Sequence, residues 1–294
     1  MTGSTPVTAA GWRPTFMAGC LARTPFRQLV PAAASAGFAS TTLWPNIWRH
    51  AQHRDALSLR DMRAMLDDAG LTLTDVDACF DWVPPSSGPG PGPMRHRVPR
   101  QEFFDICVAL GGTTLIAVHQ TDAGLDIGRD TASFAGLCDE AAAHGLRVAL
   151  EFVPFTNVPD LATAWRIVSG AGRPNAGLVL DIWHYVRSGR DEALLARIPA
   201  DRISTVQLCD GLTTTPADLA QEAMYGRMMP GAGEFGVAAF VAQLHMMGVR
   251  APCGPELYQR SFEDHPPRHV AAGLYRALHH TIEAALVPGE RNPR

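Results

Sequence analysis

The feature that most constrains the fold is a regular alternation of short apolar runs with longer segments of helical period. This pattern is typical of a parallel β-sheet whose strands are connected by helices. Eight such units in 294 residues fit a single closed (β/α)8 barrel better than an open doubly wound sheet, and no G-x-G-x-x-G motif follows the first run. We predict strands near Phe16–Cys20, Phe38–Leu43, Leu73–Trp82, Thr114–Val118, Val148–Val153, Leu178–Ile182, Ser204–Leu208 and Ala251–Leu257.

The helical segments between these runs carry start and stop signals. One helix would begin after Asp130 as N-cap and stop at Gly145. Apolar residues spaced by three and four predict further helices at Leu161–Ser169 and Val237–Met247, and a last helix at about His269–Ala285.

No second domain is required, so residues 1–294 are predicted to form one barrel domain. We expect residues 1–14 to be disordered. Residues 84–96 follow the third strand and are rich in Pro and Gly, which excludes regular structure. This loop would lie on the rim formed by the carboxyl ends of the strands, either as a lid or as a solvated insertion.

Composition excludes several classes of function. A net charge of -4 gives no electrostatic footprint for nucleic acid, and no apolar stretch approaches the length that spans a bilayer. All 25 basic residues are arginine, so no lysine of this chain can form a Schiff base. The six cysteines are scattered singly and are expected to be reduced. We therefore expect a cytoplasmic protein that acts on a small molecule.

Four oxygen-bearing side chains end successive apolar runs in the second half of the chain. They are Glu151, Asp181, Gln207 and Glu256. Parallel barrel strands deliver their last residues to one rim, and three carboxylates with one amide suit a single divalent cation such as Mn, with Mg or Co as alternatives. A single acid at a strand end is often only a cap or an ion pair, but four in succession indicate a metal site.

At this point the chain resembles the xylose isomerase-like barrels, the sugar phosphate isomerase and epimerase family. The motifs that carry the resemblance are LEFVPF with Glu151, LVLDIWHYVRSG with Asp181 and His184, VQLCDG with Gln207 and Asp210, RMMPGAGEFG with Arg227, and PELY with Glu256. The resemblance covers most of the chain.

The resemblance implies a role for each matching residue. It makes Glu151, Asp181, Gln207 and Glu256 the metal ligands, and it makes Glu151 and Glu256 the pair that moves protons. His184 and Arg227 would contact the substrate, with His184 as a further catalytic residue. A homodimer is expected only from the family.

Two departures bear on the substrate. Ketose 3-epimerases of this family carry a second Glu six residues after the first, where this chain has Asn157. The seventh strand carries Gln207 in place of the usual His, which resembles the dehydratase branches. A simple ketose is therefore not the expected substrate.

Other candidates near the rim are aromatic or histidine side chains. Trp44, Trp82 and Trp183 either stack on the substrate or pack in the core. His119 ends the fourth run and would either face the pocket or serve the structure.

The shared chemistry is proton removal next to a carbonyl to give a metal-stabilised enediolate. The main hypothesis is an isomerase or epimerase of a sugar or related polyhydroxy carbonyl compound. The alternative is a dehydratase of a cyclic hydroxyketone such as 3-dehydroshikimate or an inosose. A zinc nuclease is disfavoured because a basic face and a histidine cluster are missing, and a non-catalytic binder remains an option.

Overall fold

The computed structural model describes residues 11–84 and 98–286. Its strands are β1 (Arg13–Phe16), β2 (Ser40–Leu43), β3 (Thr72–Cys79), β4 (Thr114–Val118), β5 (Arg147–Glu151), β6 (Ala176–Asp181), β7 (Ile203–Leu208) and β8 (Pro252–Pro255). Each strand pairs in parallel with the next, and β8 pairs with β1 to close the barrel. The predicted (β/α)8 barrel is confirmed.

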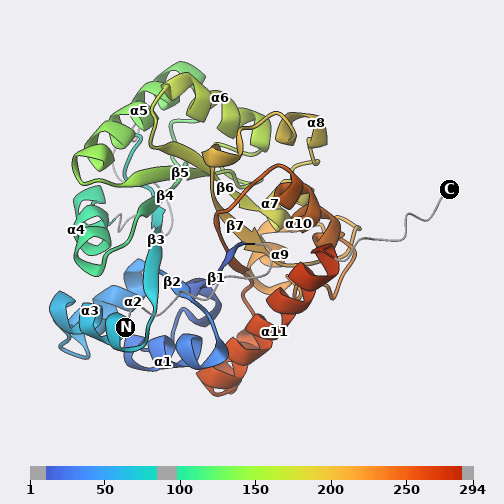
Figure 1. The fold of residues 1–294 in the computed structure, drawn as a ribbon. Helices are drawn as coiled ribbons and strands as arrows, with labels where there is room; N and C mark the ends of the chain where they lie inside the picture. The colour runs from blue at the N-terminus through green and yellow to red at the C-terminus, as the bar shows by residue number, and fades with distance from the viewer. Residues whose placement is uncertain (1–10, 85–97, 287–294) are drawn as a thin grey trace.

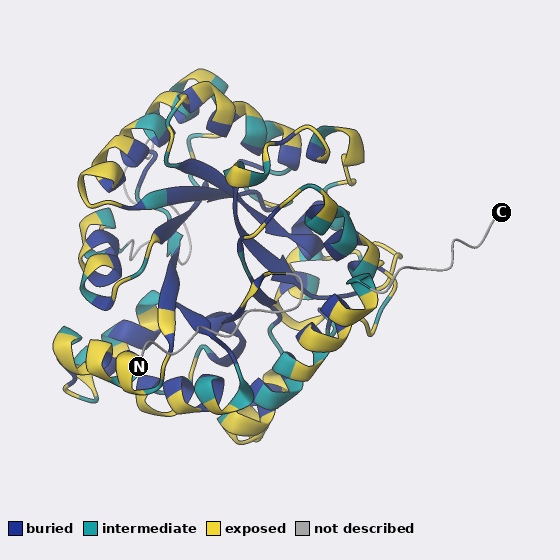
Figure 2. Ribbon diagram, in the orientation of Figure 1, coloured by how far each residue is buried: buried dark blue, intermediate teal, exposed yellow. Residues whose placement is uncertain are grey.

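Helices surround this barrel (Figure 1). They are α1 (Phe26–Ala36), α2 (Pro45–His53), α3 (Leu59–Asp68), α4 (Arg100–Leu110), α5 (Ile127–Ala143), α6 (Leu161–Ala171), α7 (Ile182–Arg187), α8 (Glu192–Leu195), α9 (Leu219–Tyr225), α10 (Val237–Met246) and α11 (Pro267–Leu286). Short 3-10 turns occur at Ala18–Leu21, Ala200–Arg202 and Arg260–Asp264. Figure 2 shows the strands buried and the outer faces of the helices exposed, as expected for amphipathic helices on a barrel. Among the described residues, no helix is both long and apolar enough to span a membrane.

The first strand lies earlier in the chain than predicted. β1 occupies Arg13–Phe16 instead of the predicted Phe16–Cys20. Most of the predicted strand lies in a 3-10 turn, Ala18–Leu21. Gly19 lies in this turn against two aromatic rings, and a Cβ at this position would come within 2.5 Å of Trp44 and 2.8 Å of Tyr258. Residues 13–14, at the end of the segment expected to be disordered, are the first residues of β1. Residues 1–10 lie outside the described residues, as does nearly all of the 84–96 loop.

The helix predicted from Asp130 begins earlier. Its N-cap is Asp126, whose carboxylate accepts a hydrogen bond from the Arg129 amide at 2.9 Å, and Asp130 is a fully buried residue of the first turn. Two aspartates four residues apart both fit an N-cap pattern, and the choice depends on which one faces the core. The end of the helix was predicted correctly, since Gly145 follows it with a φ of 73°.

The barrel interior contains one buried acid beneath the rim. Asp75 of β3 accepts a hydrogen bond from the Thr205 hydroxyl of β7 at 3.1 Å. Burial raises the pKa of Asp75 to about 7, although hydrogen bonds from Thr205, Thr74 and Thr114 lower it. This contact shows that β3 and β7 face each other across the barrel.

We expect Asp75 to make the stability of the protein depend on pH. In the unfolded chain an aspartate ionises near about pH 4. Between about pH 4 and pH 7 the folded state therefore binds more protons than the unfolded state, so stability falls as pH rises. Urea unfolding at several pH values in this window should show a flatter dependence for Asp75→Asn than for the wild type. Equal slopes in the two proteins would contradict the assignment.

Candidate active site

The four predicted ligands reach the carboxyl-terminal rim of the barrel. Glu151 and Asp181 are the last residues of β5 and β6, Gln207 lies in β7, and Glu256 directly follows β8. All four side chains are buried. Asp181 and Gln207 are register partners in the β6–β7 pair, so the sheet places their side chains next to each other.

Asp181 also positions His184. Its Oδ1 atom accepts hydrogen bonds from the backbone amides of Trp183 at 2.6 Å and His184 at 3.2 Å, and it thereby caps α7. This places His184 Nε2 at 3.5 Å from Glu151 Oε1 and 3.8 Å from Asp181 Oδ2. One potential ligand atom from each of the three residues lies within 4.8 Å of the other two. The geometry therefore groups His184 with Glu151 and Asp181. Its predicted role as a substrate contact did not include this closeness to the two acids.

Arg227 is the buried cation of the site. Its Nη1 atom donates to Asp181 Oδ2 at 2.7 Å and to the Glu256 carbonyl at 3.2 Å, and its guanidinium lies over the Trp183 and Tyr258 rings. Burial alone would raise the pKa of Asp181, but the charges of Arg227 and His184 outweigh burial and lower it. Asp181 is therefore ionised.

In two other acids, Glu256 and Asp77, the pKa is raised instead of lowered. Burial raises the pKa of Glu256 well above its usual value, and the negative charges of Asp77, Glu151 and Asp181 raise it further. Burial likewise raises the pKa of Asp77, with added repulsion from Glu151 and Asp75. The rim thus contains more carboxylates than one arginine can neutralise, an arrangement that a bound cation would relieve.

Asp77 is an acidic residue of the cavity that was not predicted from the sequence. It lies near the end of β3, inside a run that was predicted to continue to Trp82 as a strand, and it was therefore not treated as a strand-end residue. A usable signal was present: Asp75 and Asp77 are two residues apart and so lie on one face of the strand, where they interrupt an otherwise apolar pattern.

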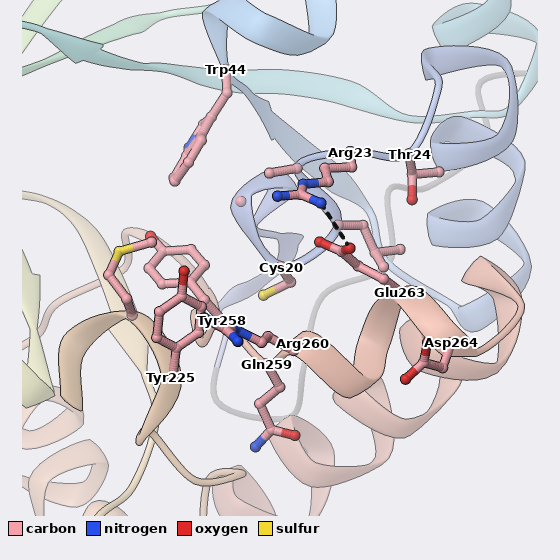
Figure 3. Close-up of a pocket in the computed structure, with 14 residues that line it drawn as sticks. Cys20, Arg23, Thr24, Trp44, Tyr225, Tyr258, Gln259, Arg260, Glu263 and Asp264 are labelled. Carbon is pink, nitrogen blue, oxygen red and sulfur yellow. Dashed lines mark hydrogen bonds and ion pairs between the residues drawn. The ribbon is translucent and has the colours of Figure 1, made fainter. Parts of the chain in front are cut away.

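A cavity of about 400 Å³ opens above these residues. Its lining includes Trp44, Asp77, Glu151, His184, Arg227 and Glu256. A second cavity of about 550 Å³ adjoins it and shares Trp44, Met224 and Tyr258 with it. Figure 3 shows this outer cavity, with Trp44 and Tyr258 on the side away from Asp264 and with the Arg23–Glu263 ion pair between. Trp44 thus has the rim position predicted for it.

Three predicted substrate contacts are not among the residues that line the inner cavity. The buried Trp82 indole donates to the Val118 carbonyl at 2.9 Å and packs against His119. His119 is directed into the α5 side, where its Nε2 atom lies 3.2 Å from Asp130 Oδ2. For both residues the geometry favours the structural alternative, because the Trp82 indole and the His119 Nε2 atom are directed toward groups inside the protein.

Trp183 supports the site from behind. It is fully buried, its indole donates to Glu222 Oε2 at 3.0 Å, and its ring packs against His184 with an interplanar angle of 85°. Of its two alternatives, substrate stacking or core packing, the geometry favours packing, here against the His184 and Arg227 side chains.

Asp210, which belongs to the VQLCDG motif, orders the adjacent loop. Its carboxylate accepts hydrogen bonds from the amides of Gly211, Gly231 and Phe235. These bonds hold the PGAG segment that follows Arg227. Asp210 is therefore a turn-capping residue.

Gln207 tests whether the donor set fits a metal ion. Its Oε1 atom is buried and accepts no hydrogen bond from any described residue. A buried amide oxygen without a partner is costly, and a cation next to Asp181 would satisfy it. The oxygen and imidazole donors gathered here are therefore suitable for a divalent ion.

Comparison with known proteins agrees with the fold and the motifs. The model of the xylose isomerase-like TIM barrel family matches residues 30–278, which is most of the chain. The chain belongs to the xylose isomerase-like TIM barrel family. The resemblance proposed from the motifs is thereby confirmed.

Curated relatives within this family are enzymes. A 3-dehydroshikimate dehydratase of Pseudomonas aeruginosa is 28% identical over 260 residues, which cover 85% of this chain and 39% of that protein. An inosose isomerase of Halalkalibacterium halodurans is 30% identical over 135 residues, covering 44% of this chain and 47% of that protein. The chain thus spans about two fifths of the length of the dehydratase that it matches.

Among solved structures, the IolI protein with a bound zinc atom has a similar fold. It superposes with a TM-score of 0.79 at 17% identity, covering 94% of this chain and 99% of that chain. At this identity the likeness supports the barrel fold alone. The chain is thus a barrel of a family that contains enzymes, and its relatives include both a dehydratase and isomerases.

Proposed function

We propose that this protein is a divalent-metal-dependent dehydratase that removes water from a cyclic hydroxyketone, with 3-dehydroshikimate or an inosose as the substrate class. The observation that carries the proposal is the buried group of Glu151, Asp181 and His184, together with the unpartnered Gln207 oxygen. Dehydration is favoured over isomerisation because the match to the dehydratase covers 85% of the chain, whereas the match to the inosose isomerase covers 44%.

Glu151, Asp181, Gln207 and Glu256 would hold the ion, and His184 Nε2 is near enough to join them. When bound, a divalent ion withdraws charge from a carbonyl and an adjacent hydroxyl, which makes the neighbouring C–H group more acidic. We expect Mn, with Mg or Co as alternatives. If His184 also binds, its imidazole makes zinc a further ion to test.

We assign the proton transfers to carboxylates that line the cavity. Glu151 lines the cavity and is close to His184, so its carboxylate is placed to take the proton next to the carbonyl. Glu256 also lines the cavity and is the second carboxylate that can move a proton there. Arg227 keeps Asp181 ionised and lines the same cavity, where its guanidinium can contact an oxygen of the substrate.

A second candidate is an isomerase or epimerase of a polyhydroxy carbonyl compound. It shares proton removal by Glu151 and differs only in that the proton returns to carbon. The relatives named inosose isomerase favour this alternative.

Product analysis separates the two candidates. The purified protein would be supplied with Mn²⁺ and incubated with 3-dehydroshikimate and, separately, with an inosose. A dehydratase yields a product lighter by one water with a changed ultraviolet spectrum, whereas an isomerase yields a product of unchanged mass. Absence of a lighter product from both compounds, with a product of unchanged mass from the inosose, would replace the dehydratase proposal by the isomerase.

A further inference from the structure

We propose that Asp77 is the catalytic acid of this site and gives its proton to the hydroxyl that leaves the substrate. This role rests on the proposed dehydration and adds a residue that none of the recognised motifs contains. Asp77 lies on the wall of the cavity, and one of its carboxyl oxygens has no hydrogen-bond partner among the described residues.

The position of Asp77 follows from the contact beneath it. Asp75 of β3 and Thr205 of β7 are hydrogen bonded across the barrel interior at 3.1 Å. Side chains two residues further along a strand lie on the same face, one layer nearer the rim. In β3 that residue is Asp77 and in β7 it is Gln207. Asp77 therefore faces the proposed metal ligands from the opposite wall.

Among the described residues, one oxygen of the Asp77 carboxyl group has a hydrogen-bond partner and the other has none. Its Oδ2 atom accepts a hydrogen bond from the Trp44 indole at 3.1 Å, which fixes its orientation. Its Oδ1 atom is buried and has no hydrogen-bond partner among the described residues, although Asp77 lines the inner cavity. A buried polar atom without a partner at a cavity wall is suited to a ligand that supplies the missing contact.

The charge around Asp77 favours its acid form. Burial raises its pKa well above the usual value, and repulsion from Glu151 and Asp75 raises it further. The arginine of the site forms its close ion pair with Asp181, at 2.7 Å. Burial therefore favours the protonated form of Asp77, which a proton donor needs, while Asp181 remains ionised.

A substrate between the two walls would place its ketone toward Asp181 and Gln207 and its far side toward Asp77. Glu151 takes the proton next to the carbonyl. The electron pair left on carbon forms the new double bond as the bond between the neighbouring carbon and its hydroxyl oxygen breaks. The Asp77 proton goes to that oxygen, and water leaves. Asp77 then regains a proton from solvent, and Glu151 releases one.

Asp77→Asn tests this role, because the amide keeps the shape of the side chain and an acceptor for the Trp44 indole but has no proton to transfer. The protein would be loaded with Mn²⁺ and given 3-dehydroshikimate in deuterated water. Product formation, deuterium in recovered substrate and Mn²⁺ binding would be measured together. The matched control is Asp75→Asn, one layer deeper on the same face of β3 and not among the residues that line the cavity.

We expect Asp77→Asn to bind Mn²⁺ as the wild type does and to form product roughly 10²–10⁴-fold more slowly. Deuterium should still enter recovered substrate, because the first proton transfer does not need Asp77. Asp75→Asn should retain product formation. Wild-type product rates in Asp77→Asn would overturn the proposal. So would a parallel loss of product and deuterium exchange in a variant that still binds Mn²⁺, because Asp77 would then serve binding or the first step. Failure of the wild type to release water is a separate result, which overturns the dehydratase assignment and this role with it.

Discussion

Replacing Glu151 by Gln is expected to lower turnover roughly 10²–10⁴-fold, the usual contribution of a general base, and further if metal is lost. Glu151 ends β5 and lines the cavity, and its Oε1 atom lies 3.5 Å from His184 Nε2. Glutamine has nearly the same shape but cannot accept the substrate proton. It also removes one negative charge from the proposed ligand set. Proton removal and metal binding therefore both depend on this carboxylate.

Turnover and deuterium exchange would be measured in Glu151→Gln with saturating Mn²⁺. A suitable control is Glu140→Gln on the outer face of α5, where Glu140 forms an exposed ion pair with Arg100. The control removes the same charge and should leave both rates unchanged. Wild-type exchange in Glu151→Gln would show that another residue removes the proton.

The second large effect concerns stability, and it is expected from Arg227→Met. Arg227 and Asp181 are both buried and form an ion pair of 2.7 Å. Methionine fills similar space but leaves Asp181 charged and without its cation. Breaking one partner of a buried pair typically costs about 3–5 kcal/mol, far more than the loss of an exposed pair. The variant without metal should therefore unfold at a markedly lower urea concentration.

A double-mutant cycle with Asp181→Asn isolates the interaction between the two charges. Asp181→Asn alone leaves Arg227 buried, and among the described residues its remaining acidic partner is the more distant Glu256, 4.0 Å away. The double variant has neither charge, so its loss should be smaller than the sum of the two single losses. Strict additivity would mean that the two charges do not stabilise each other. Addition of Mn²⁺ should restore part of the stability of Arg227→Met by neutralising Asp181.

Much of the barrel could be predicted because its pattern is local. Most strands coincide with a short apolar run, although β1 lies earlier than its predicted run, and the helices α6, α10 and α11 each show a helical period. The rim position of Glu151, Asp181 and Glu256 follows from one rule, that parallel strands end on the same side. Their roles as ligands stay predictions until a metal is measured.

The questions that the sequence left open concern the direction of side chains rather than the presence of elements. Trp82 and His119 lie at or next to the ends of predicted strands, which suggested a place near the rim. Their polar atoms are nevertheless directed to Val118 and Asp130. The sequence has no local signal for such contacts, which depend on the register between β3, β4 and α5. The pairing of Arg227 with Asp181 is also non-local, because 46 residues separate them.

Asp77 illustrates the opposite case, in which a signal was present but depended on the end of a strand. The strand was predicted to run to Trp82, whereas β3 ends at Cys79 after an irregularity in its pairing with β4. With that end in place, Asp77 is near a strand terminus like the four predicted ligands. Alternation of polar residues within an apolar run is therefore a useful guide to the rim of such barrels.

The most direct test of the account is Mn²⁺ binding, measured by equilibrium dialysis on protein first freed of metal. The wild type is predicted to bind about one ion per chain, and Asp181→Asn is predicted to lose that ion because the substitution removes the ionised ligand beside Gln207. Equal binding in both proteins would place the ion elsewhere. No specific binding of Mn²⁺, Mg²⁺, Co²⁺ or Zn²⁺ by the wild type would contradict the central claim that this rim is a metal centre.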